Sequence, residues 1–139
     1  MAARHALSLE TVVTPKQTAG IVESIRQLRV AHETAVKSRS VAMVQLSDLV
    51  RTAPSVLREQ LMIRKTLEAK ATLCRRMRPD TDRMSEPINA AKLALRSLAR
   101  RIALLDDEIA DLDTQLVPLV ATAAPCTTAL LGISTGHAG

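Results

Sequence analysis

Apolar residues recur at steps of three and four from Ile88 to Leu119, and polar residues fill the positions between them. This spacing puts the apolar residues on one face of a helix with a heptad period, which favours a coiled coil over a buried helix of a bundle. Pro118 should stop or kink the last turn of this helix. The residues expected to form its seam are Ile88, Leu95, Leu98, Ile102, Leu105, Ile109, Leu112 and Leu116.

A first helix is predicted from Thr14 to about Val50. It opens with "TPKQ", in which Thr14 can act as the N-cap and Pro15 suits the first helical position. Gln17 completes a capping box with Thr14. The expected inward face of this helix contains Ile21, Ile25, Leu28, Ala35, Ala42, Leu46 and Leu49.

His32 and Arg39 fall on that same face, so the middle of the first apolar stripe is weak. A second helix is predicted from Pro54 to about Met77, and the proline-containing segment "RPDTDRMSEP" then breaks the chain. The pattern as a whole predicts an all-α fold, a helical hairpin or coiled coil of three helices.

Charge is distributed unevenly along the chain. All 19 Lys and Arg residues lie at or before Arg101, so residues 1–101 carry a net charge of +10 and residues 102–139 carry −5. A positive segment of this size is compatible with a polyanionic partner such as nucleic acid. A solvated helical surface would give the same composition, and both readings stay open.

The charges of the third helix run against its dipole, because the bases come first and the acids last. Antiparallel pairing would set this basic half beside the acidic half of a partner helix. The partner could be a second copy of the chain or one of the two basic helices before it. We expect an antiparallel homodimer through the seam. The bases are Lys92, Arg96, Arg100 and Arg101, and the acids are Asp106, Asp107, Glu108, Asp111 and Asp113.

The stretch "CRRMRPD" places Arg75, Arg76 and Arg78 at the end of the second helix. Cations there interact favourably with the helix dipole, so capping alone would explain them, whereas phosphate contact is the sharper hypothesis. Arg100 and Arg101 are candidates for the same contact, although pairing with acids of a partner helix explains them equally well. The chain contains no aromatic residue, which removes any base-stacking platform for single strands.

No catalytic or metal site is legible in the sequence. The histidines His5, His32 and His137 are scattered and stand at no ligand spacing with cysteines or acids. The acids Asp107, Glu108 and Asp111 share a helical surface but flank the apolar seam, where a solvated face is the ordinary explanation. We therefore predict no catalytic residue, no metal and no cofactor in this chain.

Features of cellular location are few. Cys74 and Cys126 are far apart, and a reduced cytoplasmic setting is the default for such a pair. The start "MAARHALSLE" has no apolar core of a secretory signal. Residues 116–136 are uncharged, but Pro118 and Pro125 interrupt them, so short packed elements are expected in place of a membrane span.

Two stretches resemble insertion-sequence transposases of the one-ten family, the DEDD-type recombinases guided by a bridge RNA. The segment "LRVAHETAVKSRSVAMVQLSDLVRTAPSVLREQL" matches two motifs that follow the catalytic N-terminal domain of that family, and "CRRMRPD" and "AAKLALRSLARRIALLDDEIADLDTQLVPLV" resemble their continuation. The matching positions of the two motifs are Val36, Lys37, Arg39, Ala42, Gln45 and Leu46, then Thr52, Ala53, Pro54, Leu57, Arg58, Glu59, Gln60 and Leu61.

The resemblance extends to the end of the chain. Gly132, Ile133 and Thr135 match the start of the family's helix-hairpin-helix, and Ser134 replaces its second glycine. The resemblance implies that these four residues are candidate DNA contacts. It also implies that the acidic RuvC-like domain with its magnesium, and the serine nucleophile, lie outside this chain.

The expected organisation follows from this resemblance. Residues 1–13 would be a tail from the N-terminal catalytic domain, residues 14–122 a helical coiled-coil connector, and residues 123–139 a truncated start of the C-terminal domain. The implied function is that of a fragment of a DNA transposase, catalytically inactive by itself, which assembles through helices and contacts DNA or guide RNA. The alternative is a free-standing helical adaptor that binds a partner protein.

Overall fold

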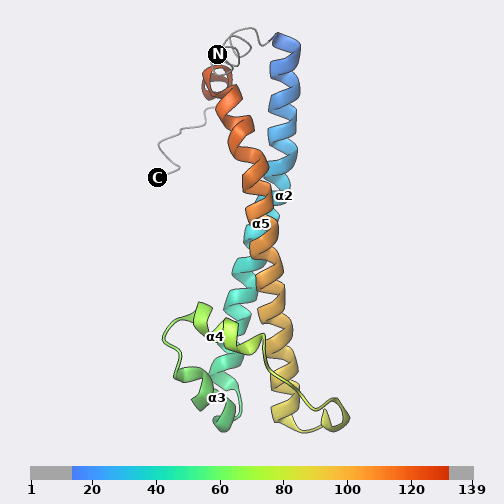
Figure 1. The fold of residues 1–139 in the computed structure, drawn as a ribbon, viewed down its shortest axis with the longest axis vertical. Coiled ribbons are helices and arrows are strands. Elements are labelled where there is room, and N and C mark those ends of the chain that lie inside the picture. Colours follow the sequence, from blue (N-terminus) through green and yellow to red (C-terminus); the bar gives the residue numbers. More distant parts are fainter. Residues whose placement is uncertain (1–13, 132–139) are drawn as a thin grey trace, which may run out of the picture. The chain divides into compact units, whose positions relative to one another are not determined.

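The computed structural model describes residues 14–131, and the side chains of residues 14–124. Every regular element in this part of the chain is helical, so the predicted all-α class is confirmed. The elements are α2 (Pro15–Thr52), α3 (Ser55–Met62), α4 (Leu67–Cys74), the 3-10 helix η1 (Thr81–Arg83) and α5 (Pro87–Leu131), as Figure 1 shows.

The capping box at the start of α2 is confirmed. The Gln17 backbone N–H donates to the Thr14 hydroxyl at 3.1 Å, and the Thr14 backbone N–H donates to the Gln17 side-chain oxygen at 2.9 Å. These bonds satisfy backbone donors that a helix N-terminus otherwise leaves unpaired. At the other end, Pro54 follows Thr52 after one residue, and α2 ends there.

The prediction of one continuous second helix is wrong, because the structure divides it into α3 and α4. Thr66 has an extended backbone, with φ −108° and ψ 157°, and its side chain accepts a hydrogen bond from the Ala69 N–H at 3.1 Å. This N-cap starts a new helix after the break. The sequence carries a weak sign of it, since the apolar spacing lapses between Leu61 and Leu67.

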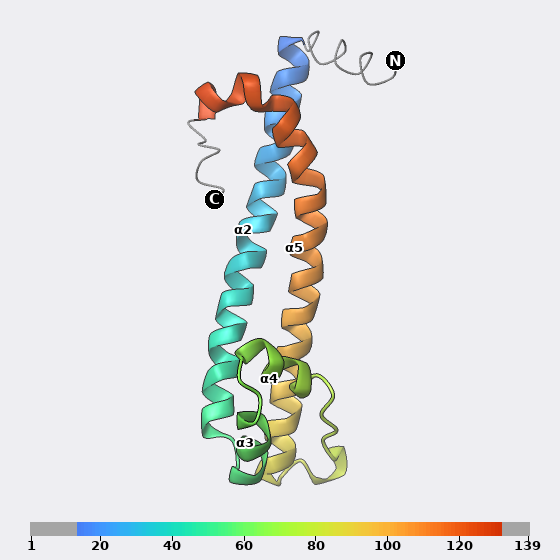
Figure 2. The same cartoon turned by 60° about the vertical axis from the view of Figure 1, so that its left-hand side comes forward.

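Of the two outcomes predicted for Pro118, a stop or a kink, the stop is wrong, because α5 continues to Leu131. Proline removes one intrahelical hydrogen bond, but its ring is exposed and the residues around it pack. Leu116 and Ala123, on either side, are both buried against α2. The ribbon changes direction within the last turns of α5 (Figure 2), as proline allows.

The described chain divides into two compact units. Unit 2, Thr34–Ile109, holds α3, α4 and the adjoining parts of α2 and α5. Its core is aliphatic, as the absence of aromatic residues requires, and it joins all four helices. The buried members are Ala42, Leu46, Val50, Ala53, Leu57, Leu61, Ala71, Cys74, Leu95, Leu98, Ala99 and Ile102.

Unit 1 comprises Met1–Glu33 and Ala110–Gly139, of which residues 14–33 and 110–131 are described. It contains one stretch of α2 and one of α5. Among residues 14–33 and 110–124 its buried core is small, and consists of Ile25, Leu116 and Ala123. Two paired helices leave much of their apolar surface uncovered, which is the physical reason for so few buried residues. Within residues 14–131, none of the helices combines the length and the apolar content that crossing a membrane requires.

Candidate nucleic-acid interface

Two polar residues on the apolar face of α2, His32 and Arg39, face acids of α5. In unit 2, Arg39 Nε donates to Asp106 Oδ1, and the Arg39 side chain is partly covered. In unit 1, His32 Nε2 lies 2.9 Å from Asp113 Oδ1. The partner for the acidic half of α5, which the sequence left open, is therefore in part the first helix of the same chain.

These two pairs act on alignment more than on stability. The acids are half exposed, and ion pairs in such positions contribute only about 0–1 kcal/mol. The enclosed His32 Nε2 has no hydrogen bond of good geometry, so its attraction to Asp113 requires a protonated imidazole. We expect the Arg39–Asp106 pair to disfavour other registers within unit 2, because a slipped helix would leave a half-buried guanidinium without its partner.

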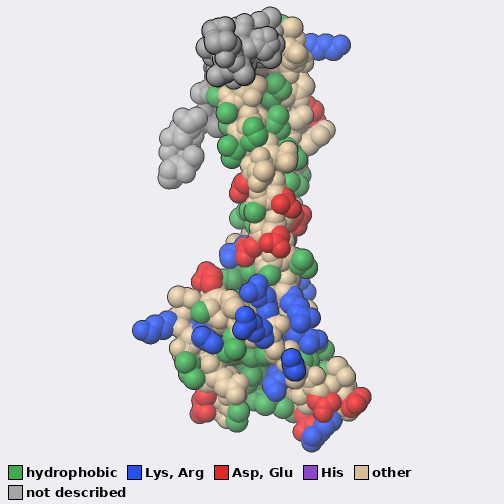
Figure 3. All heavy atoms as spheres, viewed as in Figure 1, with side chains coloured by type: hydrophobic (Ala, Val, Ile, Leu, Met, Phe, Trp, Pro, Cys, Tyr) green, Lys and Arg blue, Asp and Glu red, His purple; other side chains and the backbone are tan. Residues whose placement is uncertain are grey.

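Two basic clusters that are separate in the sequence meet in unit 2. Arg75 directly follows α4, and Arg100 Nη2 donates to the Arg75 carbonyl oxygen at 3.4 Å. Arg96, one turn earlier on α5, donates through Nη1 to the Met77 carbonyl oxygen, also at 3.4 Å. These contacts bring Arg96 and Arg100 of α5 to the segment that carries the other three arginines, and the five are called the basic face: Arg75, Arg76, Arg78, Arg96 and Arg100. Figure 3 shows Lys and Arg side chains gathering over α4 and the adjoining part of α5.

Among the residues described, carboxylates form no ion pairs with this basic face, although Glu68 and Asp106 line a hollow together with Arg75. Within residues 14–124, none of its five arginines forms an ion pair. Other arginines do: Arg26 pairs with Glu23, and Arg51 pairs with Asp48 at 2.6 Å. Within one chain Arg100 contacts a backbone carbonyl, and its pairing with acids of a second copy stays a prediction.

Capping explains part of the basic face. Arg96 and Arg100 donate to carbonyl groups just beyond the end of α4, where cations are favoured. A guanidinium has five N–H donors, however, and one long bond leaves most of them available. Arg75, Arg76 and Arg78 are exposed and donate no side-chain hydrogen bond among the residues described. Cap formation therefore accounts for the position of the two α5 arginines and leaves the other three unexplained.

Arg101 is not joined to this face by any side-chain contact. Its side chain is exposed and makes no hydrogen bond or ion pair within the described part of the chain. Gly132, Ile133, Ser134 and Thr135 lie outside the described residues.

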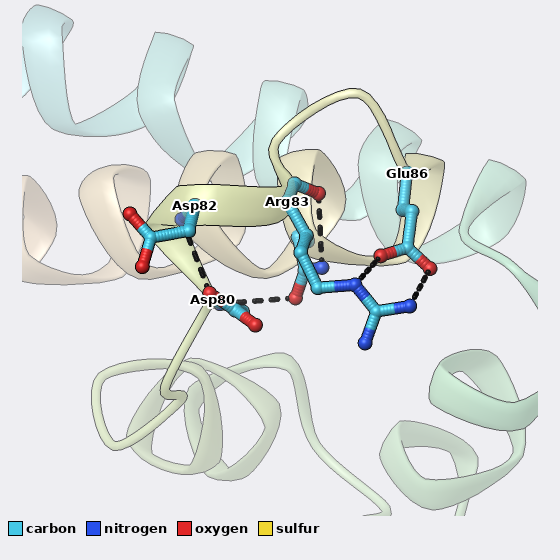
Figure 4. A network of polar contacts seen from close by, with 5 residues as sticks. Asp80, Asp82, Arg83 and Glu86 are labelled. Carbon is cyan, nitrogen blue, oxygen red and sulfur yellow. Dashed lines mark hydrogen bonds and ion pairs between the residues drawn. The ribbon is translucent and has the colours of Figure 1, made fainter.

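A buried amide that the sequence analysis did not single out fixes the loop between the two clusters. Asn89 is 7% exposed, and its Oδ1 accepts from the Asp80 N–H at 3.0 Å while its Nδ2 donates to the Arg83 carbonyl at 3.1 Å. In the same loop Asp80 caps η1 through the Asp82 N–H, and Arg83 pairs with Glu86 (Figure 4). An Asn in the first turn after a proline was the available signal, but it does not say which groups the amide meets.

The predicted seam of α5 is partly used inside the chain. The structure buries Leu95, Leu98, Ile102 and Leu116. Ile88, Leu105, Ile109 and Leu112 are half-buried. A second copy could contact only the parts of these side chains that remain exposed. The dimer therefore stays a prediction of the sequence.

Other chemistry is sparse in the part of the chain that the structure describes. There, no group of three or more His, Cys, Asp or Glu residues is placed to hold a metal ion. Asp107, Glu108 and Asp111 are all exposed. Cys74 is fully buried and unpaired, and burial raises the pKa of its thiol to about 11, which keeps it protonated and unreactive at neutral pH.

Comparisons of this chain with family models, with curated proteins and with solved structures find no match.

Proposed function

We propose that this chain is a helical segment of a DNA transposase of the one-ten family, which contacts the nucleic-acid backbone through the basic face of unit 2. The observation that carries the proposal is the contact of Arg100 with the Arg75 carbonyl, which joins two clusters 25 residues apart. Five arginines without carboxylate partners then lie together on a surface built from α4, its following loop and α5.

The chemistry of this face suits phosphates more than bases. Guanidinium groups bind phosphate oxygens in a two-pronged geometry and retain their charge at any physiological pH. Recognition of a particular nucleotide sequence would require side chains that reach base edges from a helix or strand placed in a groove of the duplex. With no aromatic residue to stack on a base, double-stranded DNA or paired RNA is the expected ligand.

The family assignment rests on the two motif series in α2 and α3 and on their continuation in α5. The proposal gives this chain a role in helical assembly and backbone contact. It assigns the chain no step of strand cleavage or exchange.

Duplex binding over a range of salt concentrations tests the proposal. We expect weak binding with little sequence preference, and an affinity that falls steeply with salt because bound phosphates release counterions. Replacing Arg75, Arg76 and Arg78 by Ala should weaken binding equally for unrelated sequences and lower the salt slope by up to about 3. The matched control replaces three arginines that are paired with acids outside the basic face, Arg26, Arg51 and Arg83. Sequence-specific binding, or binding that salt does not affect, would contradict the proposal.

A second candidate function, binding of a further helix as an adaptor, is favoured by one observation. Unit 1 has an open groove of about 620 Å³ between α2 and α5 with a largely apolar lining. A second copy of this chain is the occupant that the sequence suggests. Sedimentation of the wild type and of Val120→Asp distinguishes an occupied groove from an empty one. The substitution should change the sedimenting mass only if a second copy occupies the groove. The lining residues are Arg29, His32, Glu33, Asp113, Leu116, Val117, Val120, Ala121 and Ala124.

A further inference from the structure

A hollow of about 290 Å³ beside α4 carries positive charge and no negative charge. It is lined by Arg64, Ala69, Thr72, Leu73 and Arg76. A smaller hollow of about 110 Å³ in the same unit has a mixed lining, in which Glu68 and Asp106 offset Arg39 and Arg75. The charge of its lining therefore favours an anion in the larger hollow, whereas the charges that line the smaller one balance.

The backbone that presents Arg64 is already fixed. Lys70 Nζ donates to the Arg64 carbonyl oxygen at 2.8 Å, and the Arg64 N–H donates to the Leu61 carbonyl at 3.1 Å. The Thr66 cap then starts α4 directly below this turn. Holding the backbone in place reduces the entropy that ordering the Arg64 side chain on a ligand would cost.

The side chains that line the hollow leave two guanidinium groups available. Neither Arg64 nor Arg76 forms a side-chain ion pair or hydrogen bond among the residues described. The Thr72 hydroxyl donates to the Glu68 carbonyl at 3.1 Å, so its proton is engaged. Ala69 and Leu73 contribute only apolar surface, which strengthens attraction between a guanidinium and an anion by excluding water.

We infer that this hollow holds one phosphate group of a nucleic-acid backbone, clamped between Arg64 and Arg76. The inference deepens the proposed function and rests on it, since Arg76 also belongs to the basic face. Two cations that flank a small cavity repel each other until an anion enters. At about 290 Å³ the hollow is at the lower limit of small-molecule sites, which suits a phosphate group better than a larger ligand.

Salt-dependent duplex binding by Arg64→Ala, Arg76→Ala and the double variant tests the clamp. If both arginines hold the same phosphate, each single variant keeps one cation on it, and the salt slope falls by less than about 0.9. The double variant should then lose the whole contact, with a slope lower by about 0.9. Arg51→Ala, which removes an equal charge elsewhere in unit 2, should leave the slope unchanged.

Two slope changes of about 0.9 that add in the double variant would overturn the shared clamp in favour of two separate contacts. Slopes equal to that of Arg51→Ala in all three variants would overturn the site altogether. A wild-type chain without salt-dependent binding would instead refute the proposed function.

Inorganic phosphate is the second probe and does not depend on duplex binding. In the full chain labelled with ¹⁵N, we expect the side-chain Nε–Hε signals of Arg64 and Arg76 to shift saturably with phosphate and that of Arg51 to stay in place. Chloride at equal ionic strength is the control. Shifts with phosphate but no binding of duplex would make free phosphate the ligand and overturn the nucleic-acid part. No shift at either arginine would refute the clamp.

Discussion

Asn89 reaches back nine residues to accept the Asp80 backbone N–H at 3.0 Å. Its amide also donates to the Arg83 carbonyl, so both ends of a nearly buried polar group are satisfied. The loop that follows Arg78 is thereby anchored to the first turn of α5. The same anchor keeps the end of α4 close to Arg96 and Arg100. The arginines of these two segments together form the basic face.

Asn89→Ala should lower the free energy of unfolding by about 1–3 kcal/mol, because it leaves the Asp80 N–H and the Arg83 carbonyl without their partner. Urea unfolding followed by circular dichroism measures the change. Ser97→Ala, at an exposed position of the same helix, should stay within about 0.5 kcal/mol of the wild type. Equal stability of the two variants would mean that the loop needs no anchor.

Cys74 should make stability depend on pH in the alkaline range. Burial raises the pKa of its thiol from 9.0 to about 11 in the folded chain, so between these values the unfolded state loses a proton that the folded state keeps. The stabilisation is complete below pH 9 and is lost as the pH rises toward 11. At about 1.4 kcal/mol per pKa unit, the loss is at most about 3 kcal/mol. Urea unfolding at pH 8 to 11 should show this loss in the wild type and a smaller one in Cys74→Ala, so the difference between the two chains is the contribution of the thiol.

Arg39→Leu should change the unfolding free energy little, because the ion pair with Asp106 is partly exposed and such pairs contribute about 0–1 kcal/mol. Leu46→Ala, in the fully buried core of the same helix, should cost about 2–5 kcal/mol. Chemical denaturation of both variants makes the comparison. A loss for Arg39→Leu as large as that for Leu46→Ala would show that the ion pair stabilises the fold in addition to setting its register.

Leu105→Asp tests the antiparallel dimer that the sequence predicts. Leu105 is only half-buried in the single chain, so an aspartate there should disturb an interface more than the monomer. We expect the wild type to sediment as a dimer at micromolar concentration and the variant as a monomer of similar helical content. A wild-type monomer with full helical content would contradict the dimer. It would mean that the helices of one chain cover each other's apolar faces.

The sequence alone determined the all-α class, the capping box at Thr14 and the apolar faces of α2 and α5. These follow from local rules, since helical periodicity and cap chemistry depend on neighbours within a few residues. The break at Thr66 and the passage of α5 through Pro118 were decided by the tertiary structure. At Thr66 the local cap agrees with the break but is too weak a signal to predict it, whereas at Pro118 packing of neighbouring segments outweighed a strong local preference.

The basic face was predicted in its parts and not as a whole. The sequence indicated Arg75, Arg76, Arg78 and Arg100, but only the packing of α4 on α5 brings Arg100 to the Arg75 carbonyl. Arg64 gave no readable signal, and the position of Asn89 after a proline did not say which groups its amide meets, because the role of each depends on groups from another segment of the chain. Periodicity reports which face of a helix is covered. What covers it, and which charges then become neighbours, is fixed by long-range packing that no local pattern encodes.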